Sequence, residues 1–461
     1  MLAKMLERIS HYDCCSYPIS GEVRMQIKLP WGPGTLSVDV PDSWKVVFPE
    51  RKGGGKRKKT DSLAVVRDSL NKPIGAKPLQ SHKLKGKKIV IIVDDNTRPT
   101  PVDMFFHLIL DSLVKAGASL KNVTVIPALG IHTPMKEAEM AEKLGPKNFK
   151  RVKWENHEAF DLKANHYFGS TSRKTPVYLN KHLKDADLVV SVGLIEPHIW
   201  AGFGGGLKNI LPGVAYAETI GVHHEIISEP PYHFNRVGVM PEKNSFRQDL
   251  EEIGNMIKAE IFCVNVVIDH NRIVLASFAG DPVMAHRKGM DYNYHELGLH
   301  LDRQVDGIIV NSFPMDINFK QSMKCVGNSL PALKPGGAVM AFMRAERGLD
   351  DIRPQKTPPL PVLKAVLRLI GPARVRGLIE KTKKGLSIEE KFLVYYSLQL
   401  VRQYELYFYV PGLSEIEARQ AGFFVRCQDP AEVIRHGMRK IGKNATVAVF
   451  PDAGETFPIL K

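Results

Sequence analysis

The sequence predicts an α/β protein with two domains, in which parallel-type sheets are flanked by helices. This prediction rests on three short apolar runs, Lys87–Asp95, Asn122–Leu129 and Ala186–Val192. Each run is followed by polar residues and then by a segment whose apolar residues recur at helical spacing. Runs rich in β-branched residues are typical of strands buried on both faces of a parallel sheet. The repeated order of strand, loop and helix favours parallel pairing with helical crossovers.

Length, charge and cysteine content bound the possible functions. The 461 residues carry a formal net charge of +15 and include five cysteines. This length allows two or more domains with full cores. Much of the positive charge lies in local runs without interleaved aromatics, such as Arg51–Lys59, which favours solvated loops over a nucleic-acid surface. With no metal-type cysteine spacing, secretory leader or long apolar run, we expect a cytoplasmic protein that binds neither nucleic acid nor a membrane.

The first predicted domain covers residues 1–280 and contains the three apolar strands. Alternating residues either side of a Gly-Pro-Gly turn predict an N-terminal hairpin. Prolines delay the helix that follows the first buried strand. The other elements expected in this domain are the hairpin Val23–Val47, helices at Asp61–Leu70, at Val102–Ala116 and after Pro134, and a closing hairpin of Ile261–Asp269 with Arg272–Ser277.

The second predicted domain covers residues 281–461. Its expected elements are a helix at Val283–Leu299, strands at Val305–Ser312 and Gly336–Phe342, a helical insertion over about 352–408, and a final helix and strand in AEVIRHGMRKIG and ATVAVFP. The insertion is basic and includes the amphipathic stretch GLSIEEKFLVYYSLQLV, which is typical of a lid or a packing element.

Polar residues follow each of the three predicted strands of the first domain. The clusters are Asp94–Pro101, Gly130–His132 and the segment Gly193–Ala215. Because ligands of open α/β sheets bind outside the carboxyl ends of the strands, we predict the functional site there.

The segment Gly193–Ala215 combines a carboxylate, an imidazole, clustered glycines and a lysine. Clustered glycines let a backbone approach a ligand closely and leave amide N–H groups for an anion. The cluster is not a dinucleotide fingerprint, because Leu207 stands at the third glycine position, and it is not a Walker loop, because Asn209 follows Lys208.

The candidate residues suit a small anionic hydroxy acid. His132 and His198 each close a strand and form a possible acid/base pair, and Asp95 could orient one of them or a substrate hydroxyl. Arg98 and Lys324 suit a carboxylate. Lys208 could bind phosphate, act as a structural cation or act as a nucleophile, and these alternatives stay open. His223 and His224 could reach a metal, although their order with Glu225 is not that of a zincin.

Five motifs together resemble the nickel-dependent lactate racemases: DDNTRPTP, GIH, IEPHIWAGFGGGLKNILPGVA, GVHHEI and KQSMK. The resemblance extends from the N-terminal hairpin onward and weakens after about Ile352. It implies a racemase or epimerase of 2-hydroxy acids that uses a nickel pincer nucleotide. That cofactor is a pyridinium mononucleotide whose two sulfur-bearing arms and ring carbon bind nickel. Enzymes of cofactor biosynthesis would then be partners, with a small 2-hydroxy acid as substrate.

The resemblance also implies a role for each matching residue. Lys208 would tether the cofactor through a thioamide, beside the loop Gly204, Gly205 and Gly206, and His224 would complete the nickel coordination. His132 and His198 would be the acid/base pair, with Asp95, Arg98, Gln321 and Lys324 binding or orienting the substrate. One histidine would take the hydroxyl proton while C2 loses hydride, which avoids a costly carbanion.

The sequence departs from the family pattern at one position, and two alternative functions stay open. Lys320 stands where lactate-type members are expected to have an aromatic residue, so we hypothesise a substrate larger than lactate, with a second carboxylate or more hydroxyls. A sugar-acid epimerase of the same family would fit as well. A non-catalytic anion- or nucleotide-binding protein on the same scaffold is the other alternative, and the presence of both histidines with Lys208 argues against it.

Overall fold

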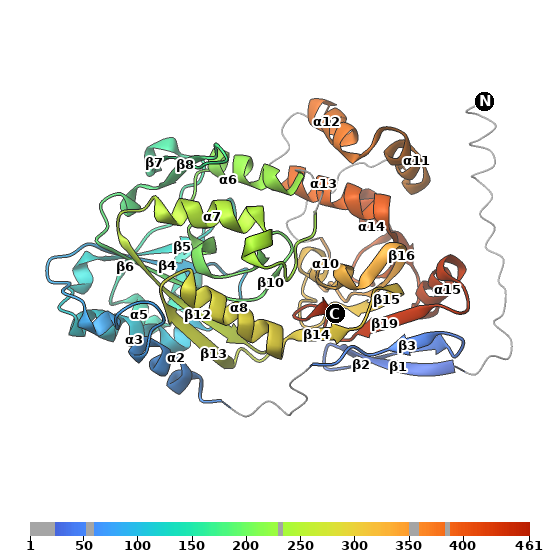
Figure 1. Ribbon diagram of the computed structural model, residues 1–461, viewed down its shortest axis with the longest axis horizontal. Helices are drawn as coiled ribbons and strands as arrows, with labels where there is room; N and C mark the ends of the chain where they lie inside the picture. The colour runs from blue at the N-terminus through green and yellow to red at the C-terminus, as the bar shows by residue number, and fades with distance from the viewer. Residues whose placement is uncertain (1–23, 52–59, 229–233, 350–358, 383–387) are drawn as a thin grey trace.

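Two six-stranded sheets with helices around them form the framework of the described part of the chain (Figure 1). The structure is a computed structural model and describes residues 24–51, 60–228, 234–349, 359–382 and 388–461. The expected α/β class, with parallel-type sheets flanked by helices, is confirmed. Most of the basic run Arg51–Lys59 lies outside the described residues; Arg51 itself pairs with Asp452 at 2.9 Å.

The first sheet contains the three strands predicted from buried apolar runs. Its order is β13 (Val274–Gly280), β12 (Glu260–Ile268), β9 (Leu188–Leu194), β4 (Ile89–Asp94), β5 (Val123–Ala128) and β6 (Lys153–Trp154). Neighbouring strands are parallel except for the hairpin of β12 with β13. Every residue of β4 and of β9 is buried. Because β9, β4 and β5 pair in parallel, their carboxyl ends meet at one edge of the sheet.

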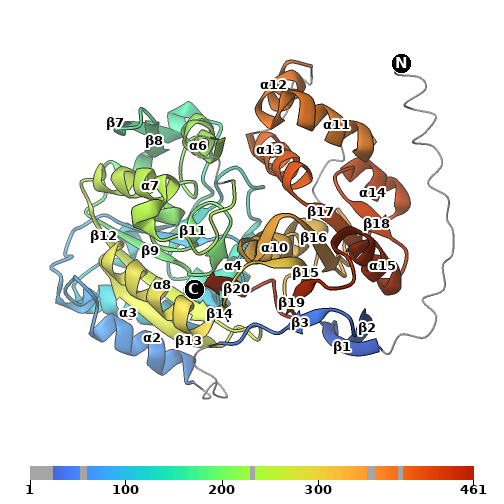
Figure 2. The same cartoon turned by 45° about the vertical axis from the view of Figure 1, so that its right-hand side comes forward.

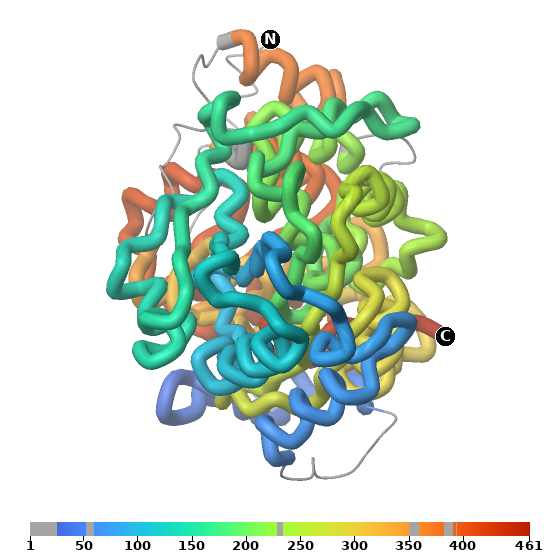
Figure 3. Tube along the Cα trace, turned by 90° about the vertical axis from the view of Figure 1, so that its left-hand side faces the viewer, coloured from blue at the N-terminus to red at the C-terminus, as the bar shows by residue number. Residues whose placement is uncertain are grey.

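Helices cover both faces of this sheet (Figure 3). They are α2 (Ser62–Asn71), α3 (Val102–Lys115), α4 (Glu137–Leu144), α5 (Pro146–Phe149), α6 (Ala217–His224), α7 (Ser245–Asn255) and α8 (Met284–Glu296). Alternate residues of β4 face opposite layers: Ile91 packs with α3, while Ile92 packs with residues of α6 and α7. A small hairpin of β7 (Asn165–Ser170) and β8 (Pro176–Asn180) lies beside α6.

The second sheet is parallel throughout. Its order is β18 (Val425–Cys427), β17 (Glu405–Tyr409), β16 (Leu333–Phe342), β15 (Val305–Asn311), β19 (Thr446–Phe450) and β3 (Lys45–Val47). The predicted N-terminal hairpin forms between β1 (Arg24–Trp31) and β2 (Gly34–Pro41), and it shares a core with β15, β16 and β19. It ends at Pro41, earlier than the predicted Val47, because β3 pairs with β19 instead. Trp44 Nε1 donates to the Gly442 carbonyl at 2.8 Å, which fixes β3 against the C-terminal part of the chain.

Three helices stand on the other side of the second sheet from the hairpin (Figures 1 and 2). They are α11 (Leu360–Ile370), α12 (Pro372–Thr382) and α13 (Ile388–Gln403). The helical insertion was predicted to end at about Phe408, and this predicted end was wrong, since α13 ends at Gln403. Residues from Glu405 onward form β17, because the buried run Leu406–Phe408 completes a parallel ladder with β16. The remaining helices are α9 (Phe319–Ser322), α10 (Lys324–Ser329), α14 (Glu415–Ala421) and α15 (Pro430–Ile441).

The helix expected at Val283–Leu299 also ends earlier than predicted. It stops at Glu296, and β14 (Gly298–Leu301) pairs with β20 (Phe457–Leu460) at the end of the chain. The domain boundary near residue 280 stays a prediction. Two elements pack with the other side of this boundary. β3 comes before it in the sequence but joins the second sheet, and α8 comes after it but packs on the hairpin of β12 and β13 in the first sheet. Within the described residues, no helix has the length and apolar character needed to cross a membrane.

Candidate active site

A cavity of about 660 Å³ lies at the carboxyl edge of the first sheet. The loops after β4, β5 and β9 form one wall, and α9, α10 and α13 of the second half form the other. The predicted site residues that line it are Asp95, Arg98, His132, His198, Gly204, Gly205, Lys208, His224, Gln321 and Lys324. Gly206 is the exception, as it is turned toward His286 and away from the cavity.

His132 is oriented by a carboxylate. Its Nδ1 lies 2.7 Å from Asp95 Oδ2, while the Thr97 hydroxyl donates to the other oxygen at 2.5 Å. Burial alone would raise the pKa of Asp95, but His132 and Arg98 lower it to about 2. The ionised carboxylate can only accept, so His132 carries its proton on Nδ1 and, when the ring is neutral, presents an unprotonated Nε2.

Lys143, which the sequence analysis missed, holds the loop that carries Asp95. Its ammonium lies 2.7 Å from Asp94 Oδ1 and donates to the carbonyls of Asp95 and Arg98, both at 3.1 Å. Its side chain is only 5% exposed, so this is a buried ion pair. Burial raises the pKa of Asp94 in spite of the neighbouring Lys143. In the sequence, nothing distinguishes Lys143 from the nearby lysines Lys136 and Lys147.

His198 is held in the opposite way to His132. It closes β10 (Pro197–His198), which pairs with β11 (Gly202–Phe203), and the turn between them points backbone amides at the ring. Nδ1 accepts from the amides of Trp200 at 3.2 Å and Ala201 at 3.1 Å. Burial, followed by the charges of Lys208 and Arg98, lowers the pKa of His198 well below its usual value, so the ring is neutral.

The glycine loop approaches its neighbours closely, but two of its amides are already used. Gly205 has φ +71° and Gly206 φ +61°, conformations that favour glycine. The Gly204 amide donates to the Glu196 carbonyl at 2.7 Å, and the Gly206 amide donates to Asn265 Oδ1 at 2.9 Å. The expectation that these amides wait for an anion was therefore wrong at these two positions, since the protein itself satisfies them.

A buried arginine from α7 fixes the same loop. The Arg247 guanidinium, 1% exposed, donates to the carbonyls of Ala201, Phe203 and Gly205. Burial lowers the pKa of Arg247 to about 10. Arg247 was not predicted as a site residue. Its place beside the apolar positions of an amphipathic helix could have indicated that its side chain is buried.

Lys208 lies on the short 3₁₀ turn that ends the loop, between Gly206 and Asn209. Burial, reinforced by the charges of Arg98 and Arg247, lowers its pKa to about 7. A large fraction of the amine is therefore neutral near pH 7, which is the form that reacts as a nucleophile.

Glu196 pairs with both cations that were expected to bind a substrate carboxylate. Its Oε1 lies 3.0 Å from Arg98 Nε, and its Oε2 lies 3.3 Å from Lys324 Nζ. Burial alone would raise the pKa of Glu196, but Lys324 and Arg98 lower it below the usual value, so the carboxylate is ionised. Glu196 is the carboxylate of the segment Gly193–Ala215, and no role was predicted for it from the sequence.

His224 faces the cavity, whereas His223 does not. His224 Nδ1 lies 2.8 Å from the Ile220 carbonyl, which can only accept, so a neutral His224 has an unprotonated Nε2. Burial lowers the pKa of His224 well below the usual value. His223 is fully buried and pairs through Nδ1 with Asp249 at 2.8 Å. Among the residues that the structure describes, no three His, Cys, Asp or Glu side chains gather as a metal site.

The opposite wall is polar near α9 and apolar near α13. Lys320, Gln321 and Lys324 line it, and Gln321 Oε1 is buried without a hydrogen-bond partner in the described part of the chain. The apolar lining includes Leu349, Leu363, Ile379, Phe392, Leu398 and Phe423. The helical insertion thus supplies much of the apolar surface of the cavity.

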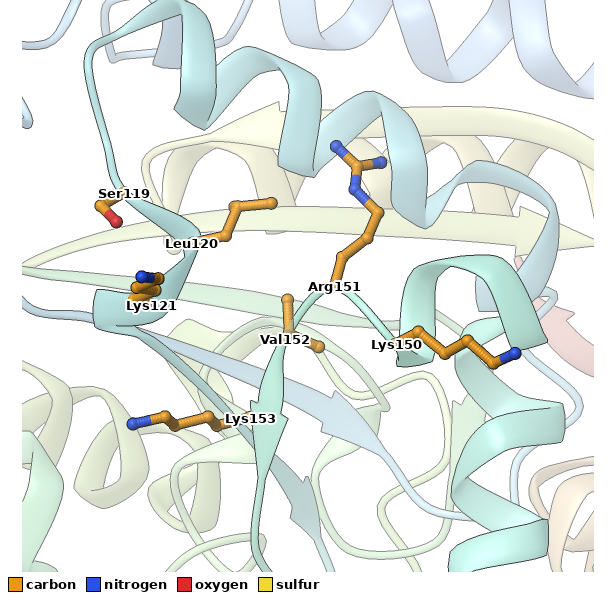
Figure 4. Close-up of a pocket in the computed structure, with 7 residues that line it drawn as sticks. All are labelled: Ser119, Leu120, Lys121, Lys150, Arg151, Val152 and Lys153. Atoms are coloured by element: carbon orange, nitrogen blue, oxygen red, sulfur yellow. The ribbon is translucent and has the colours of Figure 1, made fainter.

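A second pocket, of about 270 Å³, lies at the opposite edge of the first sheet, before β5 and β6. Its basic residues are Lys121, Lys150, Arg151 and Lys153. Their side chains point in different directions, with Lys150 and Lys153 on opposite sides (Figure 4), and Arg151 pairs with Asp111 at 2.9 Å. The charges do not converge on one point, so we assign no ligand to this pocket.

The chain is similar to known lactate racemases. Residues 31–234 match the lactate racemase N-terminal domain family. The lactate racemase of Thermoanaerobacterium thermosaccharolyticum is 33% identical over 319 residues, which cover 68% of this chain and 73% of that protein. The lactate racemase of Lactiplantibacillus plantarum is 29% identical over 326 residues, covering 70% and 75% of the two chains.

Solved structures give the same result over nearly the whole chain. The lactate racemase apoprotein of T. thermosaccharolyticum superposes with a TM-score of 0.79 at 25% identity, covering 95% of this chain and all of that one. A Thermotoga maritima protein shares the fold, with a TM-score of 0.60 at 20% identity over 86% of this chain and 97% of its own. The fold and its relatives define an enzyme of the isomerase class. The chain belongs to the lactate racemase family.

Proposed function

We propose that the protein is a racemase or epimerase of a 2-hydroxy acid and that it uses a nickel pincer nucleotide. The observation that carries this proposal is one cavity lined by His132 and His198 together with Lys208 and His224. Two imidazoles suit proton transfer at a hydroxyl, and the lysine and the third histidine suit attachment of a cofactor and its metal.

The residues present fit such a cofactor. Lys208 has a neutral amine fraction near pH 7, and His224 presents a free Nε2 lone pair. A metal that arrives with its own organic ligands needs few donors from the protein, in keeping with one histidine, His224, as its protein ligand. Trp200 Nε1, on another cavity-lining residue, is buried without a partner among the described residues, so a bound group could satisfy it. When bound, the cofactor would supply an electron-poor ring that accepts hydride and returns it.

The chain's own residues orient the substrate and handle its proton. Asp95 holds His132 so that Nε2 can take the hydroxyl proton. Arg98, Lys324 and Glu196 together carry one net positive charge, which matches a single substrate carboxylate. Fixing the carboxylate in this way keeps C2 in a reactive position.

The cavity also supports the hypothesis of a substrate larger than lactate. Lys320 lines the wall opposite the histidines, and the apolar surface from α11 and α13 extends the space beyond what a methyl group fills. A second carboxylate or hydroxyls near Lys320 would suit a larger hydroxy acid, including a sugar acid. Enzymes that build the cofactor complete the proposed set of partners.

The test is to co-express the protein with the cofactor's biosynthetic enzymes and to measure intact mass, nickel and racemisation. We expect nickel, an added mass that disappears in Lys208→Ala but persists in the control Lys153→Ala, and interconversion of at least one 2-hydroxy acid by chiral chromatography. Nickel without added mass would indicate a dissociable cofactor. A folded protein with neither nickel nor cofactor would favour the alternative, a non-catalytic anion- or nucleotide-binding protein.

A further inference from the structure

His132 and His198, two of the histidines that line the cavity, are held by opposite hydrogen-bond patterns. His132 Nδ1 faces an acceptor, the Asp95 carboxylate at 2.7 Å. His198 Nδ1 faces two donors, the backbone amides of Trp200 and Ala201. Both residues line the same cavity, and the hydrogen bonds that hold each ring in the described part of the chain are made through Nδ1, which leaves Nε2 of each for the substrate.

These contacts fix which nitrogen carries the proton. A backbone N–H only donates, so His198 Nδ1 is unprotonated and the single proton of the neutral ring sits on Nε2. A carboxylate only accepts, so His132 has its proton on Nδ1 and a lone pair on Nε2. The cavity is therefore flanked by one imidazole that can accept a proton and one that can only donate a hydrogen bond.

The backbone around His198 holds this arrangement in place. The register of β10 with β11 sets His198 opposite Gly202. Arg247 binds the carbonyl of Ala201, and Asn244 Nδ2 donates to the carbonyl of Trp200 at 3.0 Å. Turning the ring over would leave two amides without an acceptor, at about 1–3 kcal/mol for each buried donor.

We propose that His198 never exchanges its proton during the reaction and acts as a fixed Nε2–H donor to the substrate oxygen, while His132 with Asp95 is the only base. This inference rests on the proposed racemase function. A neutral imidazole can stabilise a developing charge at a carbonyl oxygen without becoming charged itself. Loss of its Nε2 proton would leave an imidazolate, because Nδ1 has no proton to retain.

The proton and electron balance follows from this assignment. The hydroxyl proton moves to His132 Nε2, and the imidazolium is stabilised by Asp95. The bound cofactor would supply the acceptor for the hydrogen that leaves C2 with its electron pair, and the oxygen becomes a carbonyl that accepts from His198. The 2-oxo acid then turns over about the axis of its C2=O bond, so the oxygen stays beside His132 and His198 while the carboxylate leaves Arg98 and Lys324 and changes places with the rest of the substrate. The other face of C2 is then open to the returning hydride that the bound cofactor would supply, and His132 gives the proton back to the oxygen.

Matched glutamine variants test the assignment in the cofactor-loaded enzyme. A glutamine amide can replace an Nε2–H donor but cannot act as a base. We expect His132→Gln to lose about 10²–10⁴-fold in kcat, the range of a general base. We expect His198→Gln to retain most of the rate and His198→Met to lose about 10²–10³-fold, as for a removed oxyanion donor. His270→Gln, on the exposed turn after β12, is the control.

An equal loss in His198→Gln and His132→Gln would overturn the proposal in favour of two exchanging bases. A loaded wild-type enzyme that interconverts no 2-hydroxy acid would overturn the proposed function, and the catalytic assignment with it. Nitrogen NMR of ¹⁵N-histidine-labelled apoprotein gives a readout that needs no activity. We expect His198 to be protonated at Nε2 and His132 at Nδ1, assigned by the signals lost in each glutamine variant. A proton on His198 Nδ1 would contradict the proposal even in an active enzyme.

Discussion

The carboxylate of Glu196 lies between Arg98 and Lys324, 3.0 Å from Arg98 Nε and 3.3 Å from Lys324 Nζ. The two cations that a substrate carboxylate would meet are thus already paired with a carboxylate of the chain. Glu196 keeps them together and sets the net charge that an entering anion meets. Glu196, on the loop after β9, therefore also sets the charge around Lys324 on the opposite wall of the cavity.

Replacing Glu196 with Gln should leave two partly buried cations without their partner. We expect Glu196→Gln to lower the free energy of unfolding at pH 7 by about 1–3 kcal/mol, less than for a fully buried pair because Arg98 remains partly exposed. Urea denaturation measures the loss. Glu415→Gln is the control, since its pair with Arg419 is exposed and should contribute under about 0.5 kcal/mol. Similar small losses in both variants would show that Glu196 does not hold the cations.

Asp95→Asn should affect catalysis more than binding. An amide in place of the carboxylate can donate to His132 Nδ1 and so favour the wrong tautomer, with the Nε2 lone pair lost. We expect kcat of the loaded enzyme to fall by about 10²–10⁴-fold with KM little changed. Chiral chromatography of the product measures this. Asp111→Asn, a surface carboxylate paired with Arg151, should leave both constants unchanged. A rise in KM alone would assign Asp95 to substrate binding instead.

The buried pair of Lys143 with Asp94 predicts a double-mutant cycle. Lys143→Met leaves the Asp94 carboxylate buried without its cation and releases the loop carbonyls, so we expect a loss of about 3–5 kcal/mol. Adding Asp94→Asn removes the stranded charge and should recover part of that loss. Denaturant unfolding of the two single variants and the double variant gives the coupling. Additive losses would mean that the two side chains do not interact.

Lys208 should react as a neutral amine at unusually low pH. Because burial and the charges of Arg98 and Arg247 lower its pKa to about 7, the neutral form dominates above that pH and the charged form below it. Labelling of the apoprotein at increasing pH, read residue by residue by mass spectrometry, should give a midpoint for Lys208 near 7, against about 10.4 for ordinary lysines. In Arg98→Met the midpoint should move upward. A midpoint near 10.4 in the wild type would contradict the assignment.

Much of the fold could be predicted because its strongest signals are local. β4 and β9 are buried on every residue, so their apolar runs identified them without knowledge of their neighbours. The polar clusters after these strands meet at one edge because parallel strands end together. By contrast, the first two residues of β14 were taken for the end of a helix, because the partner strand β20 lies at the far end of the chain. Pairings of that kind leave no trace in a local pattern.

The residues of the site also differ in how far the sequence predicts them. The histidines and Lys208 lie in motifs whose residue types already indicate their chemistry. Lys143 and Arg247 were missed because burial of a charge depends on which carbonyls the folded chain brings to it. The pairing of Arg98 with Glu196 was missed for a similar reason, since the two residues follow different strands. Sequence patterns thus located the site, while the partners of its charged groups needed the tertiary structure.

The pairing of β3 with β19 has a consequence for synthesis of the chain. Trp44, next to β3, donates to Gly442, a residue 398 positions later. At about 5–20 residues per second, a ribosome takes roughly 20–80 s to make the stretch between them. During that time the first sheet can fold as its strands emerge, while the N-terminal hairpin has no finished sheet to join. The second sheet therefore cannot be completed before Gly442 and β19 have been made, and the nascent hairpin must avoid other strand edges until then.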